Sequence, residues 1–426
     1  MENLINELAW RGLIQDMTPG VKEQLSKEVT SGYIGFDPTA DSLHIGNLVP
    51  IILLVHLQRA GHKPFALIGG ATGLVGDPSG KSEERNLLSE EILQHNLACI
   101  RLQLQKFLNF DSSLPNGAEI VNNYDWFKEM SFLDFIRDTG KHITINYMMA
   151  KESVKKRFDS DNGMSFTEFS YQLVQGYDFY WLYKNRNCKL QMGGSDQWGN
   201  IVTGTELIRR KIGGEAFAFT CPLITKADGG KFGKTEKGNI WLDPAKTTPF
   251  QFYQFWLNAS DEDAIRWLKI FTFLNEKDIQ DIVNEHEKDP GVRIMQKALA
   301  RELTLFVHSQ EELDKAMETT AKLFNRNSSS HAELSEIELN AIEGIVRCQY
   351  EKSNISDNPG IISFLTGTHI FLSNGEARKM ILNGGLTINY KKVTDPLMTI
   401  TGDQLLHDKF VMVQKGKKNY YLVEIV

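Results

Sequence analysis

The sequence contains few cysteines and no long apolar run, and each shortage excludes a class of protein. Its four cysteines lie far apart with no Cys-x-x-Cys pair, which excludes a clustered zinc site and disfavours a disulfide framework. The apolar run from Leu48 to Val55 covers eight residues and includes Pro50, whereas a membrane-spanning helix needs roughly 20. The stretch from Met1 to Leu8 carries acidic residues and no basic flank, unlike a secretory signal or an organelle presequence. We therefore expect reduced cysteines, no membrane span and a cytoplasmic location.

The composition is that of a folded protein with an uneven distribution of charge. Of 426 residues, 41% are hydrophobic and 24% are charged, and this length predicts two or three domains. The formal net charge is −7, which disfavours a general nucleic-acid coat. Residues 358–426 nevertheless carry eight Lys and Arg against five Asp and Glu, leaving 39 basic and 49 acidic residues in the first 357. A basic C-terminal region is thus attached to an acidic body.

The first half alternates short β-branched or aromatic runs with amphipathic stretches, a pattern typical of βαβ units and a parallel sheet. Strands are expected at Ser31–Phe36, Pro64–Ile68, Glu119–Val121, Lys189–Met192 and Phe217–Pro222. A first crossover helix is expected from Asn47 to Arg59, with Pro50 in its first turn and Gly61 after its end. Ligands of such open sheets bind beyond the carboxyl ends of the strands.

The pattern changes along the chain and predicts four regions. Residues 1–247 form a Rossmann-like α/β domain. Residues 248–324 read as helices only, and Ser260 with Asp261 to Asp263 is a capping signal. The polar stretch Asn325–Ser330 opens a linker region, 325–357, and residues 358–426 form a small α+β domain.

Two short motifs could act together on a polyphosphate. His44-Ile45-Gly46-Asn47 follows the first predicted strand at the mouth of the crossover helix, where backbone amides and an imidazole can meet phosphate oxygens. Lys231-Phe232-Gly233-Lys234-Thr235 places two lysines on a glycine-containing loop. Each motif taken alone equally fits a surface turn or a solvated loop, but the pair on one predicted sheet is far more specific.

The pair looks like the HIGH and KMSKS elements of the class I aminoacyl-tRNA synthetases, and within them the chain resembles the bacterial tyrosyl type. The resemblance covers essentially the whole chain. It implies that residues 1–247 are the catalytic domain, with a connective insertion and a dimer interface, and that the helical residues 248–324 bind the anticodon. It rests also on Tyr33–Leu43 before the histidine motif, Gly73–Lys81 after the second strand, Tyr171–Asp178, and Gly193–Gly199. Asn47 replaces the second histidine of HIGH, and Phe232, Gly233 and Thr235 depart from KMSKS as the bacterial tyrosyl type does.

The resemblance implies a role for each site residue. For tyrosine these are Tyr33 and Asp178 on the phenol, Asp77, Tyr171 and Gln175 on the α-ammonium, and Gln197 near the carboxyl group. For ATP they are Gly35, Asp37, His44, Asn47, Gly194, Asp196 and Lys234. The resemblance assigns stabilisation of the migrating phosphate charge to Thr39, His44, Lys81, Arg85, Lys231, Lys234 and Thr235. ATP would bring Mg²⁺ held mainly by its phosphates, so no protein metal ligand is expected.

RNA contacts are expected at basic clusters. Lys151 and Lys155 belong to one cluster and Arg209 and Lys211 to another, although solvated helix faces would look the same. Arg378 and Lys379 lie in a stretch that resembles an S4-type RNA-binding fold, with a helix before a β-turn and strands. The reaction implied is formation of tyrosyl-adenylate followed by transfer to tRNA(Tyr), by a homodimer. A tryptophanyl synthetase and a non-catalytic RNA-binding relative remain alternatives.

Overall fold

The computed structural model of the chain describes residues 4–77, 88–152, 154–155, 164–230, 232–235, 238–324, 336, 339, 345–356, 359–416 and 419–426. The chain divides into two units, the first made of Met1–Thr247 and Ala259–Leu299, the second of Thr248–Asn258 and Ala300–Val426. None of the helices in the described ranges combines the length and apolarity needed to cross a membrane.

A five-stranded sheet in the order β3-β2-β1-β4-β5 forms the centre of the first unit, and all its pairings are parallel. The strands are β1 (Ser31–Phe36), β2 (Lys63–Ile68), β3 (Glu119–Asn122), β4 (Cys188–Gly194) and β5 (Phe217–Cys221). All five expected strands are confirmed to within two residues. β5 is buried along its whole length, as expected for a parallel strand covered on both faces.

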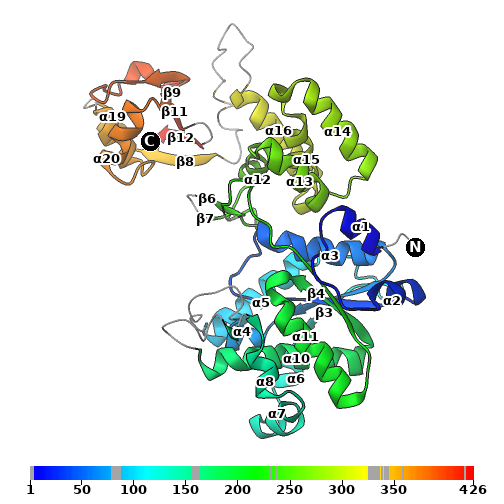
Figure 1. Cartoon of the computed structure of the whole chain (residues 1–426). Coiled ribbons are helices and arrows are strands. Elements are labelled where there is room, and N and C mark those ends of the chain that lie inside the picture. The colour runs from blue at the N-terminus through cyan, green and yellow to red at the C-terminus, as the bar shows by residue number, and fades with distance from the viewer. Residues whose placement is uncertain are drawn as a thin grey trace. The chain divides into compact units, whose positions relative to one another are not determined.

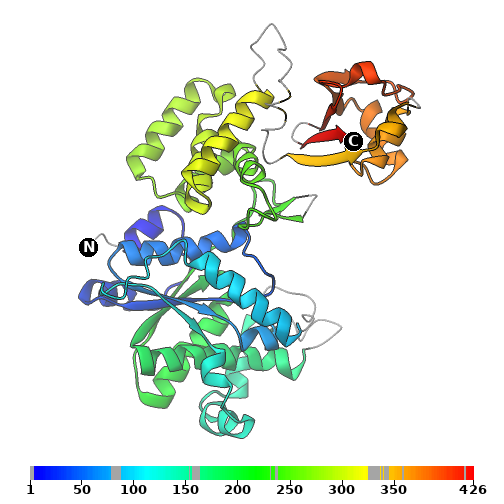
Figure 2. The ribbon, with the colours of Figure 1, turned by 180° about the vertical axis from the view of Figure 1, so that it is seen from behind.

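Helices cover both faces of this sheet (Figures 1 and 2). α3 (Leu48–Arg59) and α5 (Glu90–Leu104) pack on one face, and α10 (Phe166–Arg186) and α11 (Trp198–Ile212) on the other. α10 begins at a capping box of Ser165 and Glu168 and ends at Asn187 in a left-handed conformation. α3 begins one residue after the expected start, with Pro50 in its first turn.

The other short elements of the first unit surround this layered core. Its further helices are α1 (Leu4–Trp10), α2 (Val21–Lys27), α4 (Thr72–Val75), α6 (Tyr124–Phe127), α7 (Phe132–Asp138), α8 (Ile145–Met149), α13 (Asp261–Phe271) and α14 (Glu276–Lys288). A two-stranded hairpin pairs β6 (Lys234–Thr235) with β7 (Gly238–Asn239).

The helical stretch expected over 248–324 is shared between the two units. It contains α12 (Pro249–Leu257), α13, α14, α15 (Ile294–Val307) and α16 (Gln310–Phe324). α12 packs against α16 in the second unit, whereas α13 contacts α3 in the first. Ser260 caps α13 as the sequence indicated. The single helical domain of the sequence prediction therefore does not match the contacts, which separate α12 from α13.

The C-terminal region is a mixed α+β structure with its own sheet, in the order β10-β9-β11-β12-β8. The strands are β8 (Val346–Tyr350), β9 (Leu386–Ile388), β10 (Lys391–Val393), β11 (Phe410–Lys415) and β12 (Asn419–Ile425), and the helices are α18 (Lys352–Ser356), α19 (Ile361–Gly367) and α20 (Asn374–Leu382). β8 falls in the expected linker 325–357, yet it pairs in parallel with β12. The folded region therefore starts upstream of residue 358.

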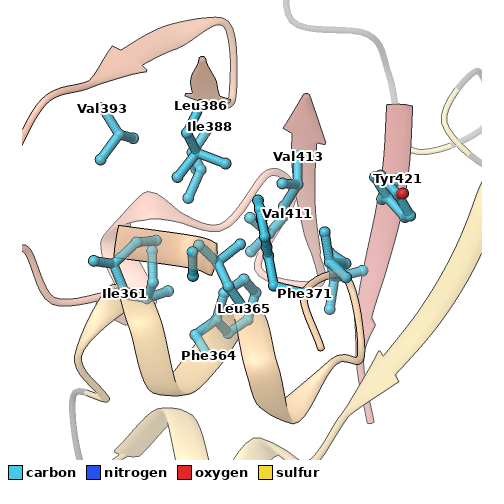
Figure 3. Packing of buried hydrophobic residues seen from close by; sticks show 14 of the residues in the cluster. Ile361, Phe364, Leu365, Phe371, Leu386, Ile388, Val393, Val411, Val413 and Tyr421 are labelled. Carbon is cyan, nitrogen blue, oxygen red and sulfur yellow. The ribbon is translucent and has the colours of Figure 1, made fainter. Parts of the chain in front are cut away.

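A continuous apolar core joins the helices and strands of this region. Figure 3 shows Ile361, Phe364 and Leu365 of α19 facing Val411 and Val413 of β11. Each of these side chains is buried. Burial of this kind contributes roughly 1.5–3 kcal/mol per large apolar side chain, so this core is a major source of stability for the region.

Candidate active site

A cavity of ≈ 1090 Å³ opens beyond the carboxyl ends of β1 and β4. The strand order reverses between these two strands, and this is the position at which open α/β sheets bind ligands. Its lining includes Tyr33, Gly35, Asp37, Thr39, His44, Asn47, Asp77, Tyr171, Gln175, Asp178, Gly194, Asp196 and Gln197. The structure thus gathers all residues expected to bind tyrosine and, of those expected to bind ATP, every one whose side chain is described.

Two buried oxygen groups lie at one end of the cavity. Tyr33 on β1 is 1% exposed, and its hydroxyl has no hydrogen-bond partner within the described part of the chain. Asp178 on α10 is 2% exposed and accepts a hydrogen bond from Trp126 Nε1 at 2.9 Å and one from Asn123 Nδ2 at 3.1 Å. A carboxyl group keeps spare acceptor positions whether it is ionised or protonated, so Asp178 can still bind a further hydroxyl. This end suits a ligand with a buried hydroxyl group.

Burial controls the protonation of both groups. It raises the pKa of Asp178 to about 8, although the hydrogen bonds from Asn123 and Trp126 act in the opposite direction. Burial also raises the pKa of Tyr33 well above its usual value, and the nearby Asp178 raises it further. Tyr33 therefore remains a neutral phenol that can donate a hydrogen bond.

The raised pKa of Asp178 predicts a pH-dependent stability. The folded protein holds this proton up to about pH 8, whereas an unfolded Asp releases it near pH 4, so the contribution of Asp178 to stability is full below pH 4 and declines as the pH rises toward 8. We expect Asp178→Asn to remove this decline. Denaturant unfolding of both proteins at pH 5.5 and pH 8.5 measures it: the variant should gain stability relative to the wild type at the higher pH, and an equal difference at both pH values would contradict the assignment.

An acidic group lies elsewhere on the cavity wall. Asp37 accepts hydrogen bonds from the Tyr171 hydroxyl at 3.0 Å and from Thr72 Oγ1 at 2.7 Å. Gln197 Nε2 donates to Asp77 Oδ2 at 2.7 Å. These carboxylates form a wall that attracts a cationic group, and their hydrogen bonds keep them in place.

Asp196 lies on the same wall, in the turn that follows β4. Burial raises its pKa, and the charge of Asp77 raises it further. Gln175 Oε1 and Gln191 Oε1 are buried without a hydrogen-bond partner among the described residues, and both side chains line the cavity. Because both amide oxygens line the cavity, they can accept hydrogen bonds from a ligand bound there.

The histidine motif forms the entry to α3. His44 Nδ1 accepts a hydrogen bond from the Gly46 amide at 3.0 Å, and the His44 amide donates to Asn47 Oδ1 at 3.0 Å. With Nδ1 engaged, a neutral His44 carries its proton on Nε2, which can donate to a ligand. A Cβ atom at residue 46 would lie 2.7 Å from the imidazole ring, so only glycine fits. The amino end of α3 adds its positive dipole to this turn.

The lysine-bearing segment meets the histidine motif through its backbone. Gly233 has a φ of +79°, and a Cβ atom there would lie 2.9 Å from Ile45 Cγ1. The Ile240 amide donates to the Gly233 carbonyl at 3.2 Å, and the Ile45 amide donates to the Ile240 carbonyl at 2.9 Å. The two motifs, nearly 190 residues apart in the sequence, therefore lie side by side.

Some expected residues are not described at the level of their side chains. Lys81, Arg85 and Lys231 lie outside the described residues. Lys234 and Thr235 are described by their backbone in β6, but not by their side chains. Only the backbone of the hairpin therefore shows where Lys234 and Thr235 lie relative to the cavity.

A basic cluster forms around the ring of Tyr147 on α8. Lys151 Nζ lies 3.9 Å from the ring centroid and the Arg210 guanidinium 5.6 Å from it. Arg209 forms an ion pair with Glu206 at 2.8 Å, and Arg210 also contacts Glu206. Burial lowers the pKa of Lys151 to about 8, while Glu206 acts in the opposite direction. Residues from the two predicted RNA-binding clusters are thus neighbours.

The other predicted RNA contacts lie elsewhere. Lys211 Nζ lies 4.3 Å from the ring centroid of Tyr180, and Lys155 is exposed. Arg378 and Lys379 are exposed on α20 in the second unit. None of these residues lines the cavity.

Sequence reasoning missed the residues that hold the carboxylates in place. Asn123 and Trp126 bind Asp178, and Thr72 binds Asp37. Asn123 directly follows β3, so the rule that polar residues beyond strand ends face the ligand could have identified it. Nothing local in the sequence distinguishes Trp126 from a core residue.

Comparison with known proteins points to one family. Residues 25–325 match the model of the class I tRNA synthetases for W and Y, and residues 337–423 match the model of the tyrosine–tRNA ligase SYY-like C-terminal domain. The tyrosine–tRNA ligase of Porphyromonas gingivalis is 58% identical over 426 residues, covering 99% of both chains. That of Bacteroides fragilis is 57% identical over 426 residues with the same coverage.

Solved structures agree with this result. A C-terminally truncated mitochondrial tyrosyl-tRNA synthetase of Aspergillus nidulans is 31% identical and has a TM-score of 0.68, covering 76% of this chain and 95% of that one. A tryptophanyl-tRNA synthetase of Encephalitozoon cuniculi, at 16% identity and a TM-score of 0.53, covers 73% of this chain and 87% of that one and shares the fold.

Proposed function

The chain belongs to the tyrosine–tRNA ligases of class I, and from this membership we propose which of its residues carry out each step of the reaction. The enzyme activates L-tyrosine with ATP to tyrosyl-adenylate and pyrophosphate, then transfers tyrosine to the 3′-terminal adenosine of tRNA(Tyr). The tryptophanyl and non-catalytic alternatives are not favoured, since the relatives at 55–58% identity are tyrosine–tRNA ligases.

Tyrosine is proposed to bind with its phenol between Tyr33 and Asp178. The hydroxyl then has one donor and one acceptor in a buried site, and phenylalanine would leave both protein groups without a partner. The α-ammonium group is proposed to face Asp77, Tyr171 and Gln175. Support comes from the acidic wall of the cavity, where the Tyr171 hydroxyl also donates a hydrogen bond to Asp37 Oδ2 at 3.0 Å.

ATP is proposed to bind across the carboxyl end of the sheet, with its ribose at Asp196 and its phosphates at Thr39 and His44. His44 Nε2 and the amino end of α3 supply hydrogen-bond donors and positive potential. We further propose that Lys234 and Thr235, together with Lys231, Lys81 and Arg85, neutralise the charge on the departing pyrophosphate. The magnesium complex of ATP is the proposed substrate form.

The chemistry needs alignment more than a protein nucleophile. The tyrosine carboxylate attacks the α-phosphorus of ATP and the bond to pyrophosphate breaks, so negative charge moves to the β- and γ-phosphates. Groups that bind this charge more tightly in the transition state than in the substrate lower the barrier. The transfer step then moves the tyrosyl group from AMP to a ribose hydroxyl of tRNA.

The observation that carries these assignments is that the phenol-binding pair and the histidine turn line one cavity, beside the backbone of the lysine loop. ATP–pyrophosphate exchange in the presence of tyrosine, tryptophan or phenylalanine tests them. We expect exchange with tyrosine alone. Exchange with tryptophan but not tyrosine, or no exchange at all, would contradict the proposal.

The basic cluster around Tyr147 is proposed to bind phosphates of tRNA. Lys151→Ala should lower tRNA charging several-fold and reduce the salt dependence of tRNA binding by about one charge, because each neutralised phosphate releases a counterion. Adenylate formation should not change. Binding titrations at several salt concentrations measure this, with Lys22→Ala on α2 as the control. An unchanged salt slope in Lys151→Ala would remove Lys151 from the interface.

We propose that Arg378 and Lys379 contact tRNA through an S4-like C-terminal domain. Both side chains are exposed on α20, in a region with an excess of basic residues. We also propose that the enzyme works in the cytoplasm, where charged tRNA is consumed by translation.

A homodimer is proposed, with α7 at its interface. Phe132, Leu133 and Ile136 of α7 are 63%, 75% and 45% exposed, and they share one face of the helix. Apolar side chains this exposed mark association surfaces. Leu133→Asp should therefore shift the protein from dimer to monomer in sedimentation velocity runs at micromolar concentration, whereas Leu372→Asp, which changes a 93% exposed leucine elsewhere, should not. If the wild-type protein sediments as a monomer at this concentration, the proposal is wrong.

A further inference from the structure

One face of α13 carries a row of side chains that contact the lysine-bearing segment. Asp263, Arg266, Trp267 and Phe271 follow the helical spacing that places residues on one side. α13 and the segment from residue 223 to 241 both belong to the first unit. Neither the family resemblance nor the cavity lining assigns a role to this helix.

The upstream part of the segment is bound by polar contacts. The Ala227 amide donates to Asp263 Oδ1 at 2.9 Å, and Asp263 is 5% exposed. Arg266 donates to the Thr225 carbonyl and pairs with Asp263 at 3.2 Å. These contacts hold the backbone at positions six and eight residues before Gly233 of the lysine motif.

Phe232 supplies an aromatic contact inside the lysine motif. Its ring stacks on that of Phe271 with a centroid distance of 5.2 Å and an interplanar angle of 16°, and it meets Trp267 edge to face at 5.1 Å and 72°. The same side chain lines the cavity. Phe232 therefore lies between α13 and the cavity, two residues before Lys234.

α13 is itself fastened to the body of the first unit. Arg11, which is 3% exposed, donates to the carbonyls of Lys269 at 2.8 Å, Thr272 at 2.7 Å and Leu274 at 2.7 Å. These carbonyls lie at the carboxyl end of α13, where backbone oxygens lack partners within the helix. A helix held in this way is a fixed support for a loop.

We infer that Phe232 is a positioning residue whose ring docks on Trp267 and Phe271 of α13. We call these two aromatic side chains the seat of Phe232. The seat holds the lysine loop against the turn of His44, so that Lys234 approaches the departing phosphates from a fixed backbone. This inference rests on the proposed function, because it acts through the role of Lys234. Motion of the loop away from this seat would cost the two aromatic contacts.

Pre-steady-state adenylate formation tests the inference. Phe232→Ala should lower the rate constant roughly tenfold, or about 1.4 kcal/mol, with no change in the dissociation constant of tyrosine. Phe232→Met, which is apolar and flexible enough to fill the seat, should restore most of the rate. Phe232 is only partly buried, so its variants should fold, and their unfolding midpoints verify this.

A double-mutant cycle separates positioning from general loosening. Phe271→Ala should lower the same rate constant, and adding Phe232→Ala should cost little more, because both changes break one contact. Leu268→Ala is the control: Leu268 is buried in α13 and is neither of the two ring partners of Phe232, so the variant should lower stability and keep the rate. Additive losses, or an equal loss in Leu268→Ala, would overturn the inference.

The outcomes also separate this inference from the proposed function. If the wild type shows no exchange with tyrosine, the proposed function fails. If the wild type is active and Lys234→Ala is not, but Phe232→Ala is as fast as the wild type, only the positioning role fails.

Discussion

Replacing Lys234 by Ala should slow adenylate formation by about 10²–10³-fold while leaving the affinity for tyrosine almost unchanged. This size is typical for loss of one group that stabilises charge in a transition state. The proposed partner of Lys234 is the departing pyrophosphate, which carries its full charge only as the bond breaks, so the loss should appear in the rate and not in the binding of tyrosine. The hairpin β6–β7 and the contact of Gly233 with Ile45 place this residue beside the histidine turn.

Stopped-flow measurement of adenylate formation and equilibrium titration with tyrosine separate the two effects. Lys189→Ala is a matched control, because it also removes one positive charge, but its Nζ pairs with Glu28 at 2.6 Å at the start of β4. The control should keep its rate. Equal losses of rate and tyrosine affinity in Lys234→Ala would place the lysine at the amino acid instead.

Replacing Asp178 by Ala should abolish most of the discrimination between tyrosine and phenylalanine. A hydrogen bond to a charged or buried acceptor contributes about 1.5–3 kcal/mol, so kcat/KM for tyrosine should fall by roughly 10- to 150-fold or more. Phenylalanine has no hydroxyl and loses no such bond, so its kcat/KM should change far less. Asn123 and Trp126 also lose their acceptor, but this loss acts on both amino acids, so the ratio of the two kcat/KM values reports the contact with the phenol.

Exchange assays with both amino acids measure this ratio. Asp178→Asn keeps the shape of the side chain and tests whether folding is preserved. Tyr177→Phe is a control on the preceding residue of α10, which does not line the cavity. An equal loss for tyrosine and phenylalanine would mean that Asp178 supports the cavity without contacting the phenol.

Local patterns in the sequence predict much of the fold. The five strands of the first sheet and the entry to α3 follow from short apolar runs and from the positions of Pro50 and Gly61. Ser260 and the acids after it mark the start of α13 for the same reason, since capping depends on neighbours within one turn. The resemblance, not periodicity, supplied the cavity residues.

Contacts between residues far apart in the sequence could not be predicted from such local patterns. The pairing of β8 with β12 joins residues more than 70 positions apart, and nothing in Val346–Tyr350 alone distinguishes it from an isolated strand in a linker. The division of the helical stretch depends on which neighbour each helix buries its apolar face against, α16 for α12 and α3 for α13.

The order of amino acids already specifies the strands, the helix starts and the two motifs proposed to act on phosphates, because each depends on residues within a few positions of one another. Only the tertiary structure decides that Trp126 and Asn123 donate hydrogen bonds to Asp178 and that the Phe232 ring packs on Trp267 and Phe271. It also decides that Lys151 and Arg210 both lie over the ring of Tyr147. These contacts join side chains from separate elements, and their energies exist only once the sheet and its helices have brought those elements within a few ångströms.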